Sequence, residues 1–285
     1  MSHEIINKKR LNEEMTEIEV KAPLVASKIE PGQFIVIRMH EKGERIPLTL
    51  YKKDEEKGTV TMVFQKVGKS THELDTYEEG DEILDFIGPM GTPAEIYDFG
   101  TVVCIGGGVG TPEIFPVAEA LEKEGNDVIV ISGFRTEDLV ICDDEIEDSG
   151  CVDEFYLCTD DGTCGREGFT TDVLEELIEE GRDIDLVHAV GPPIMMKVIA
   201  DITEQHDIPT RVSLNAIMLD ATGMCGACRV EVGGEMKLAC VDGPEFDAHE
   251  VNFEEFMNRL EMFEKKEEEA MERWKEEHDN ERCCE

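Results

Sequence analysis

At 285 residues the chain is long enough for two domains and a small third, and its 40% hydrophobic content can fill ordinary cores. A net charge of −40 repels nucleic acid and anionic lipid, so we expect neither as a partner. The chain has no apolar run near the roughly 18 residues that span a membrane and no secretory signal, so its ten cysteines predict a reducing, cytoplasmic location.

Residues 1–97 have the pattern of a β domain. Short β-rich runs at 34–39, 60–65 and 81–87 are separated by pairs that contain Gly or Pro. Several short strands at this spacing predict a small antiparallel barrel.

Residues 98–212 alternate between strand and helix. The run TVVCIGGG predicts a buried strand, followed by a helix at 111–123 and the strand NDVIVISGF. A strand at 153–158, a helix at 171–180, the strand DLVHAVG and a helix from Pro193 complete the pattern. This alternation predicts a parallel sheet, and hence an α/β domain.

The Gly-rich loop in CIGGGVGTPEIF lies between a predicted strand and a predicted helix. Backbone N–H groups and a helix N-terminus in that arrangement bind a pyrophosphate. The glycines expected to let the ligand approach are Gly106, Gly107, Gly108 and Gly110. The alternative is a tight turn without a ligand.

Two further loops are expected at the carboxyl edge of the same sheet, where ligands of open α/β sheets bind. The run VGPPIMM contains Gly191, although its prolines could simply start a helix. Asp160 and Asp161 follow a strand and could accept bonds from ribose hydroxyls, or they could form a plain turn. Cys158 and Cys164 lie at no metal-ligand spacing and are predicted to be free thiols.

Two segments of the β domain carry groups that suit a phosphate-bearing ligand. Arg45 and Lys69 add positive charge to an acidic chain, and Gly68, Ser70 and Thr71 supply short donors. From the residues alone, ordinary surface solvation explains them as well.

Residues 213–250 contain the spacing D-x4-C-x2-C-x11-C, formed by Asp220, Cys225, Cys228 and Cys240. It matches the plant-type ferredoxin spacing for a [2Fe–2S] cluster, with Asp in place of the first Cys. The alternatives are a structural zinc site, which usually has two CxxC pairs, and cysteines without a metal. No histidine pair or Ser/His/Asp order indicates a hydrolase, and no catalytic side chain is predicted.

Together, seven segments resemble the ferredoxin–NADP reductase superfamily. They are ERIPLTL, VGKST, GGGVGTPEIFPVA, SGFRT, CTDDGTCGREGFTTD, VGPPIMM and DATGMCGACRV with ACVDGPEFD. The chain is most similar to the branch of electron-transfer subunits, which includes those of dihydroorotate dehydrogenase and the small subunit of NADH-dependent ferredoxin:NADP oxidoreductase, also called sulfide dehydrogenase. Asp220 is typical of that small subunit, whereas the dihydroorotate-linked relatives have Cys there.

The resemblance implies FAD on the barrel and NAD(P)H on the α/β domain. The implied flavin positions are Arg45, Pro47, Leu48 and Thr49 in one segment and Gly68, Lys69, Ser70 and Thr71 in another. The loop from Gly106 to Thr111 matches the nicotinamide nucleotide site. The expected architecture is an FAD-binding β-barrel (1–97), an NAD(P)-binding α/β domain (98–212), a [2Fe–2S] domain (213–250) and a charged C-terminal helix (251–285).

The resemblance also implies a partner, since this chain lacks the extra Cys motifs of [4Fe–4S] clusters. That partner is a large glutamate-synthase-like subunit with FAD and [4Fe–4S] clusters, and the complex performs electron bifurcation between NADH, NADPH and ferredoxin. The alternatives are the electron-transfer subunit of dihydroorotate dehydrogenase, a sulfide or polysulfide reductase subunit, and a zinc-bearing regulator.

Three features stay open at this level. Arg135 follows a sheet strand and could meet a 2′-phosphate or pair with a carboxylate. The tail from Asn252 could cover the chain's own surface or contact a partner subunit. The acidity could reflect a salt-rich cytoplasm that screens self-repulsion, or only an acidic protein.

Overall fold

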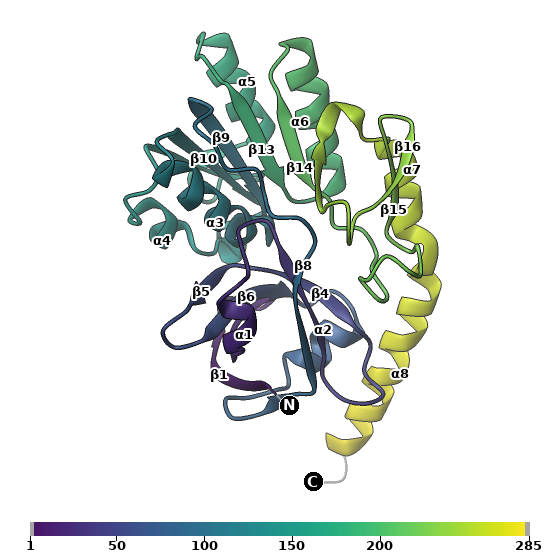
Figure 1. Cartoon of the computed structure of the whole chain (residues 1–285). Helices are drawn as coiled ribbons and strands as arrows, with labels where there is room; N and C mark the ends of the chain where they lie inside the picture. The colour runs from purple at the N-terminus through teal and green to yellow at the C-terminus, as the bar shows by residue number, and fades with distance from the viewer. Residues whose placement is uncertain (1–2, 283–285) are drawn as a thin grey trace.

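The computed structural model describes residues 3–282, and its lower half in Figure 1 is an antiparallel β-barrel. Five strands pair in the order β5-β6-β2-β1-β7, and three pair in the order β4-β3-β8. The elements are β1 (His3–Arg10), β2 (Met15–Lys21), α1 (Pro23–Ala26), β3 (Phe34–Arg38), β4 (Ile46–Thr49), β5 (Lys52–Asp54), β6 (Thr59–Gln65), α2 (Lys69–Leu74), β7 (Glu82–Ile83) and β8 (Asp85–Met90). The predicted barrel is confirmed.

One β-rich run of the barrel contains two strands rather than one. The run at 81–87 forms two strands, with Leu84 between them. β7 pairs with β1, whereas β8 pairs with β3. The chain therefore changes sheet at Leu84, whose N–H donates to the carbonyl of Met39 (3.2 Å). Hydrophobic pattern alone does not reveal such a corner, because Ile83 and Phe86, on either side of it, are both buried apolar residues.

The upper half is a seven-stranded sheet in the order β12-β11-β10-β9-β13-β14-β17, parallel except for the edge strand β17. The prediction of a parallel α/β sheet is confirmed. Its elements are β9 (Thr101–Gly107), α3 (Gly110–Lys123), β10 (Asp127–Phe134), η1 (Glu137–Leu139), α4 (Asp143–Glu147), β11 (Glu154–Thr159), β12 (Arg166–Glu167), α5 (Thr170–Glu179), β13 (Leu186–Val190), α6 (Pro193–Gln205) and β14 (Thr210–Ser213).

The C-terminal part is built onto this sheet. A hairpin of β15 (Arg229–Val232) and β16 (Glu235–Leu238) is followed by β17 (Glu245–Asp247), which pairs antiparallel with β14. The buried pair His188 Nε2 and Glu245 Oε2, 2.9 Å apart, fixes β17 to the sheet. The chain ends in η2 (Ala248–Glu250), α7 (Phe253–Leu260), η3 (Glu261–Phe263) and α8 (Glu264–Arg282).

α8 runs from the C-terminal part back down along the barrel (Figure 1). The ring of Trp274 lies 5.8 Å from the ring of His72 on α2, centroid to centroid. The tail thus covers part of the chain's own surface at the barrel.

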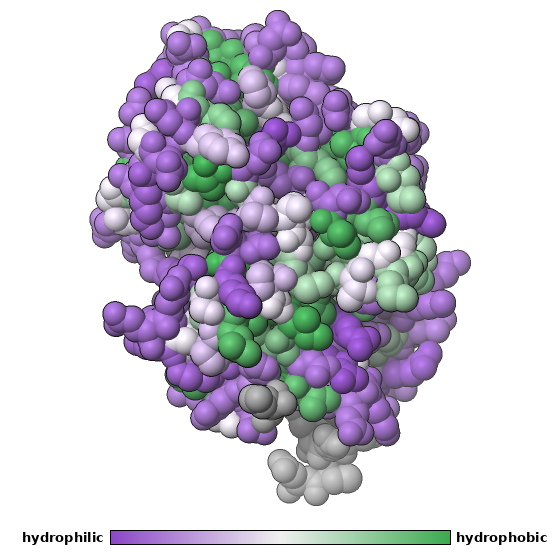
Figure 2. Space-filling view, in the orientation of Figure 1, coloured by the Kyte–Doolittle hydropathy of each residue, from purple (hydrophilic) through white to green (hydrophobic). Residues whose placement is uncertain are grey.

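The surface in Figure 2 is mostly hydrophilic, as the net charge requires, with hydrophobic side chains gathered near the middle of this face. In the part of the chain that the structure describes, no helix is long and apolar enough to cross a membrane.

Candidate functional site

Strand β3 joins the barrel to the other two parts through shared cores. Its alternate side chains point to opposite faces. Ile35 and Ile37 lie in the barrel core, whereas Phe34 and Val36 lie in a core that extends over the parallel sheet and includes Cys228 and Cys240. Every site described below is therefore held on one packed framework.

The Gly-rich loop and the loop that contains Gly191 meet at the point where the strand order of the sheet reverses. β9 has β10 on one side and β13 on the other, so the loops after β9 and β13 leave at a topological switch point. Ligands of open α/β sheets bind at such a point.

Three of the four glycines of this loop are needed for packing, and the expectation that all four let a ligand approach stays a prediction. A β-carbon on Gly106 would lie 2.5 Å from the Cα of Thr111, and one on Gly107 would lie 2.7 Å from the Sδ of Met195. At Gly110 it would lie 2.2 Å from the carbonyl oxygen of Val190. Only Gly108, with φ of +57°, faces open space among these four, and it is where a nucleotide can come closest.

Asp160 and Asp161 differ in what they can do. The Asp161 Oδ1 accepts from the hydroxyl (2.6 Å) and N–H (3.1 Å) of Thr163, and these bonds hold the pKa of Asp161 below its ordinary value. Asp161 therefore forms the turn that was the alternative reading. Asp160 is exposed beside the end of β10, with its N–H bonded to Phe134 O, and its carboxylate is the one suited to a ribose.

Arg135 pairs with a carboxylate of the barrel. Its guanidinium donates to both carboxylate oxygens of Glu14, at 3.0 and 3.2 Å. The pair lies in a pocket of about 590 Å³ between the barrel and the sheet, which Glu13 and Asp138 also line. Arg135 could be named from the sequence but Glu14 could not, because nothing in the sequence connects the turn between β1 and β2 to the end of β10.

The two predicted flavin segments lie next to each other. The Ser70 hydroxyl donates to Glu44 Oε2 (2.7 Å), one residue before Arg45. Within residues 3–282, exposed Arg45 makes no ion pair, so its charge is available to a phosphate. In β4, Leu48 points into the barrel core, and the partly exposed Pro47 and Thr49 face outward.

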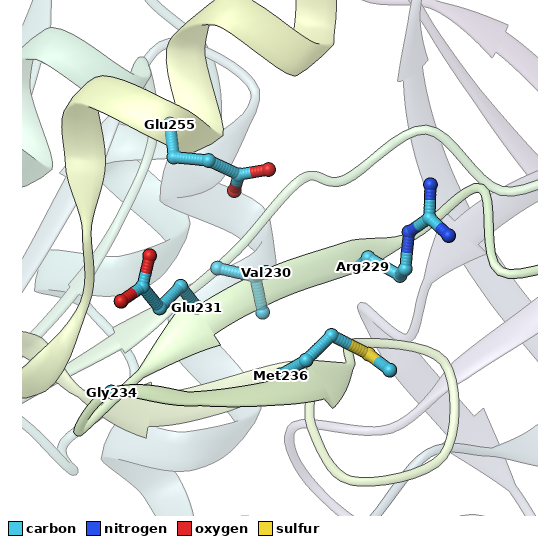
Figure 3. Close-up of a pocket in the computed structure, with 6 residues that line it drawn as sticks. All are labelled: Arg229, Val230, Glu231, Gly234, Met236 and Glu255. Carbon is cyan, nitrogen blue, oxygen red and sulfur yellow. The ribbon is translucent and has the colours of Figure 1, made fainter.

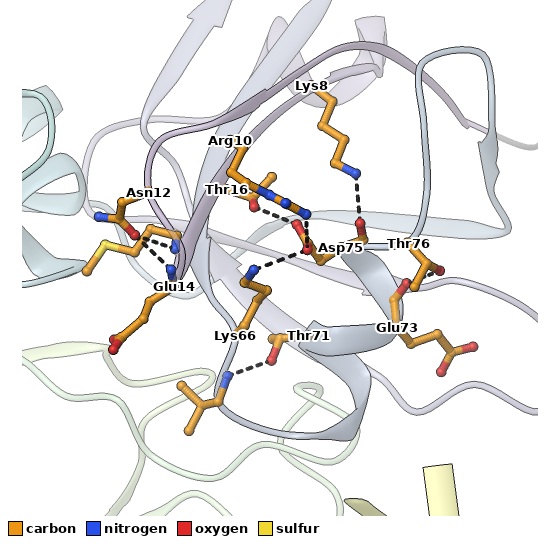
Figure 4. A network of polar contacts seen from close by, with 12 residues as sticks. Lys8, Arg10, Asn12, Glu14, Thr16, Lys66, Thr71, Glu73, Asp75 and Thr76 are labelled. Atoms are coloured by element: carbon orange, nitrogen blue, oxygen red, sulfur yellow. Dashed lines mark hydrogen bonds and ion pairs between the residues drawn. The ribbon is translucent and has the colours of Figure 1, made fainter. Parts of the chain in front are cut away.

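A polar network anchors the second segment (Figure 4). Asp75, at the end of α2, accepts from Thr16 Oγ1 (2.7 Å), Arg10 (2.9 Å) and Lys66 Nζ (3.2 Å). Burial acts to raise the pKa of Asp75, but the hydrogen bonds from Thr16 and Lys66 hold it below its ordinary value. The network therefore fixes α2 to strands β1 and β2 of the barrel at neutral pH, and with it the second segment, which consists of Gly68, Lys69, Ser70 and Thr71.

The predicted cluster ligands come from one loop and from the turn after β16, which contains Cys240. Asp220 Oδ1 accepts from the N–H of Thr222 and its Oδ2 from that of Cys225, both at 2.9 Å. The loop needs left-handed backbone at Gly223 (φ +80°) and Gly226 (φ +66°). From outside, Arg259 of α7 donates to the carbonyl of Ala227 (3.0 Å).

The donor set fits a metal centre made of thiolates. Cys228 and Cys240 are buried and hydrogen-bonded to each other, and burial followed by this bond raises the pKa of Cys240 to about 12. The N–H of Gly223 favours the thiolate only in part; a bound metal would favour it more, since metals bind thiolates with loss of the proton. Cys225 is exposed, and within the described chain no three metal-binding side chains surround a single point.

A second pocket, of about 250 Å³, lies between the β15–β16 hairpin and Glu255 of α7 (Figure 3). It is lined by Arg229, Val230, Glu231, Gly234, Met236 and Glu255, and by none of the predicted ligands. Cys158 and Cys164 are free thiols, as predicted.

Comparisons with known proteins agree with these parts. Residues 215–252 match the iron–sulfur cluster binding domain of dihydroorotate dehydrogenase B. The chain is 45% identical over 272 residues, 95% of each chain, to a Thermotoga maritima protein named dihydroorotate dehydrogenase B (NAD(+)), electron transfer subunit homolog. It is 32% identical to the Bacillus cereus electron transfer subunit of that enzyme, over 87% of this chain and 96% of the relative.

Solved structures extend the likeness to the whole fold. A structure of NADH-dependent reduced ferredoxin-NADP oxidoreductase matches with a TM-score of 0.90 and 43% identity, over 96% of this chain and 98% of the other. That match extends well into the C-terminal tail, which the sequence motifs did not cover. The ferredoxin reductase of carbazole 1,9a-dioxygenase shares the fold, with a TM-score of 0.64 and 20% identity over 73% of this chain and 66% of the other. The chain belongs to the family of dihydroorotate dehydrogenase B electron transfer subunits and their homologues, oxidoreductase subunits that join a ferredoxin reductase fold to an iron–sulfur binding domain.

Proposed function

We propose that the chain oxidises NADH and passes the electrons through FAD and a [2Fe–2S] cluster to a partner flavoprotein. The observation that carries this proposal is the single core that connects β3 of the barrel, the parallel sheet, and Cys228 with Cys240. Such a core keeps the three cofactor sites at fixed separations, as electron transfer between them requires. The bound flavin supplies the step from hydride to single electrons.

Each group of residues has a role in this scheme. Arg45, together with Gly68, Lys69, Ser70 and Thr71, would hold the flavin phosphates, and Pro47 and Thr49 would face its ring. Gly108 and Thr111 would meet the nucleotide, and Asp160 would accept from a ribose hydroxyl. Asp220, Cys225, Cys228 and Cys240 would hold the cluster.

Exposed apolar side chains around the cluster loop support a partner contact there. Met224, Met236, Leu219 and Val241 are all exposed, next to the exposed Cys225. Apolar patches of this kind mark interaction sites. We propose a large glutamate-synthase-like subunit as the partner, with ferredoxin reached through it and electron bifurcation as the reaction of the complex.

The second candidate is the electron-transfer subunit of dihydroorotate dehydrogenase. The names of the relatives and the matched cluster domain favour it. Asp220 favours the first candidate, because the dihydroorotate-linked relatives have Cys there. Co-purification from the native organism separates the two: a glutamate-synthase-like subunit supports the first, and a dihydroorotate-oxidising subunit supports the second.

The visible spectrum and EPR of the anaerobically purified chain test the proposal. Flavin bands that bleach with NADH, followed by the signal of a reduced [2Fe–2S] cluster, are expected. A colourless protein that contains zinc would contradict it.

Asp220→Cys is expected to keep a cluster and to shift its midpoint potential, because a carboxylate oxygen is a harder ligand than a thiolate. The measurement is an EPR-monitored redox titration of the variant beside the wild type. An unchanged potential would show that Asp220 only accepts the two loop N–H bonds.

Glu14→Gln is expected to tighten NADPH binding roughly threefold to fivefold, because an exposed charge of this kind contributes about 1 kcal/mol or less. The change frees Arg135 for a 2′-phosphate and removes a like charge beside it. NADH affinity should stay the same, because NADH has no 2′-phosphate. The wild type is expected to prefer NADH, because Glu14 occupies Arg135. Titration of each nucleotide by calorimetry measures both effects.

Glu13→Gln is the matched control for this prediction, since it removes the same charge from the same pocket without touching the Arg135 pair. Equal NADPH affinities of Glu14→Gln and wild type would mean that the adenosine end of the nucleotide binds elsewhere.

A further inference from the structure

One carboxyl group lies where the barrel meets the α/β domain and has no role in the scheme above. Glu113 is in the first turn of α3, three residues after Gly110. Its carboxylate accepts a hydrogen bond from the hydroxyl of Thr49, the last residue of β4. A second contact in the same place, between the rings of Tyr51 and Phe115 with centroids 6.2 Å apart, shows that α3 is packed against this end of the barrel.

This junction is where a flavin on the barrel and a nicotinamide on the sheet have to meet. Hydride transfer requires the two rings in contact. α3 starts at the carboxyl edge of the sheet, beside the Gly-rich loop, and β4 carries Thr49 on the outer face of the barrel. Thr49 and Glu113 therefore connect the two cofactor segments directly.

Glu113 is also unusual in its protonation. Burial raises the pKa of Glu113 to about 7, although the hydrogen bond from Thr49 acts to lower it. No charged side chain contributes to this shift, so the group is held between its two states by desolvation and one hydroxyl. A carboxyl with a pKa near the working pH is suited to take up and release protons.

We propose that Glu113, through the hydroxyl of Thr49, receives the proton that reduced flavin must release when it gives up its electrons. This inference rests on the proposed function. Hydride transfer from NADH adds two electrons and one hydrogen to the flavin and needs no other proton. Return to the oxidised state sends two electrons, one at a time, to the cluster and releases one proton from N5.

The proton passes in two transfers, first to Thr49 and then to Glu113. With FAD bound, the Thr49 hydroxyl would accept the proton that the reduced flavin releases, while its own proton passes to the Glu113 carboxylate. Glu113 then releases the proton to solvent and returns to its ionised form. Glu113 thus acts through Thr49 and touches neither electron carrier in this step.

Glu113→Gln tests the relay in the full-length, flavin-loaded protein. The protein is reduced with one equivalent of NADH and then reoxidised by ferricyanide in a stopped-flow instrument between pH 5.5 and 8.5. Wild-type reoxidation is expected to speed up as pH rises through about 7, since the ionised carboxylate is the acceptor. Glu113→Gln should reoxidise roughly tenfold or more slowly at pH 8 and lose this pH dependence, with the NADH reduction rate unchanged.

Glu119→Gln, six residues further along α3, is the matched control and should behave as wild type. A readout that does not depend on the rate is the time-resolved infrared difference spectrum during flavin reoxidation, because Glu113 is protonated only transiently in that step. A transient carboxyl C=O band is expected in wild type and Glu119→Gln, and not in Glu113→Gln. Thr49→Val should reproduce the slow reoxidation of Glu113→Gln and its loss of pH dependence, and Thr49→Ser should restore the wild-type pH profile of reoxidation.

A Glu113→Gln protein with the wild-type rate and pH profile, or with an unchanged carboxyl band, would overturn the relay. If Glu113→Gln does not fold, Thr49→Val and Thr49→Ser decide in its place: equal rates for these two overturn it as well. A wild-type chain that holds no FAD would instead overturn the proposed function itself.

Discussion

Cys228→Ser is expected to abolish the EPR signal of the reduced cluster and to lower the iron content at least about tenfold, since even outer-shell changes at metal sites cost 10–100-fold in affinity. The Cys228 thiol is buried beside Cys240. A hydroxyl there is a harder and weaker ligand for iron than a thiolate. FAD content and bleaching by NADH should remain, because the barrel and the Gly-rich loop are untouched.

Cys158→Ser controls for the loss of a buried thiol, since Cys158 lies in β11, away from the cluster loop. Cys225→Ser covers the case in which Cys228→Ser disturbs the core, because Cys225 is exposed and its loss leaves no cavity. Full iron content in both Cys225→Ser and Cys228→Ser would mean that the predicted ligand set is wrong.

The parallel sheet was predictable because each of its signals is local. TVVCIGGG and NDVIVISGF are long apolar runs, and Gly-rich or Pro-containing turns end them. The barrel was less predictable. β1, with the polar sequence HEIINKKR, is largely exposed and reveals itself only through its pairing with β2 and β7.

The site residues divide in the same way. Cysteine spacing and glycine-rich turns are local, so the cluster loop and Gly108 could be named from the sequence. Glu14 and Glu113 could not, because each matters only through a partner more than 60 residues away, Arg135 and Thr49 respectively. One signal existed for Glu113: it is the single charged residue in the run TPEIFPVA.

The position of α8 against the barrel could not be predicted from the sequence either. Its pattern predicts a helix but does not say what the helix covers, and its contact joins Trp274 to His72 across about 200 positions of the chain. Through this contact α8 packs against α2, which contains most of the second flavin segment.

Gly110→Ala is expected to destabilise the protein by roughly 1–3 kcal/mol, the usual cost of overpacking, and to abolish nucleotide binding at concentrations that saturate the wild type. The added methyl would lie 2.2 Å from the carbonyl oxygen of Val190 and 3.1 Å from the Cα of Gly191. Neither backbone atom can move aside without displacing the loop after β13. Thermal unfolding and NADH titration measure the two effects.

Gly68→Ala is the comparison for stability, since a β-carbon there meets nothing within 4 Å and φ is −118°. Its melting temperature should match that of the wild type. If Gly110→Ala also keeps the wild-type stability and affinity, the loops after β9 and β13 can move apart without loss of binding. The close packing of Gly107 against Gly191 then does not position the nucleotide. If stability falls and binding survives in the folded fraction, Gly110 serves packing alone, and Gly108 is the only glycine of the loop whose open face the nucleotide uses.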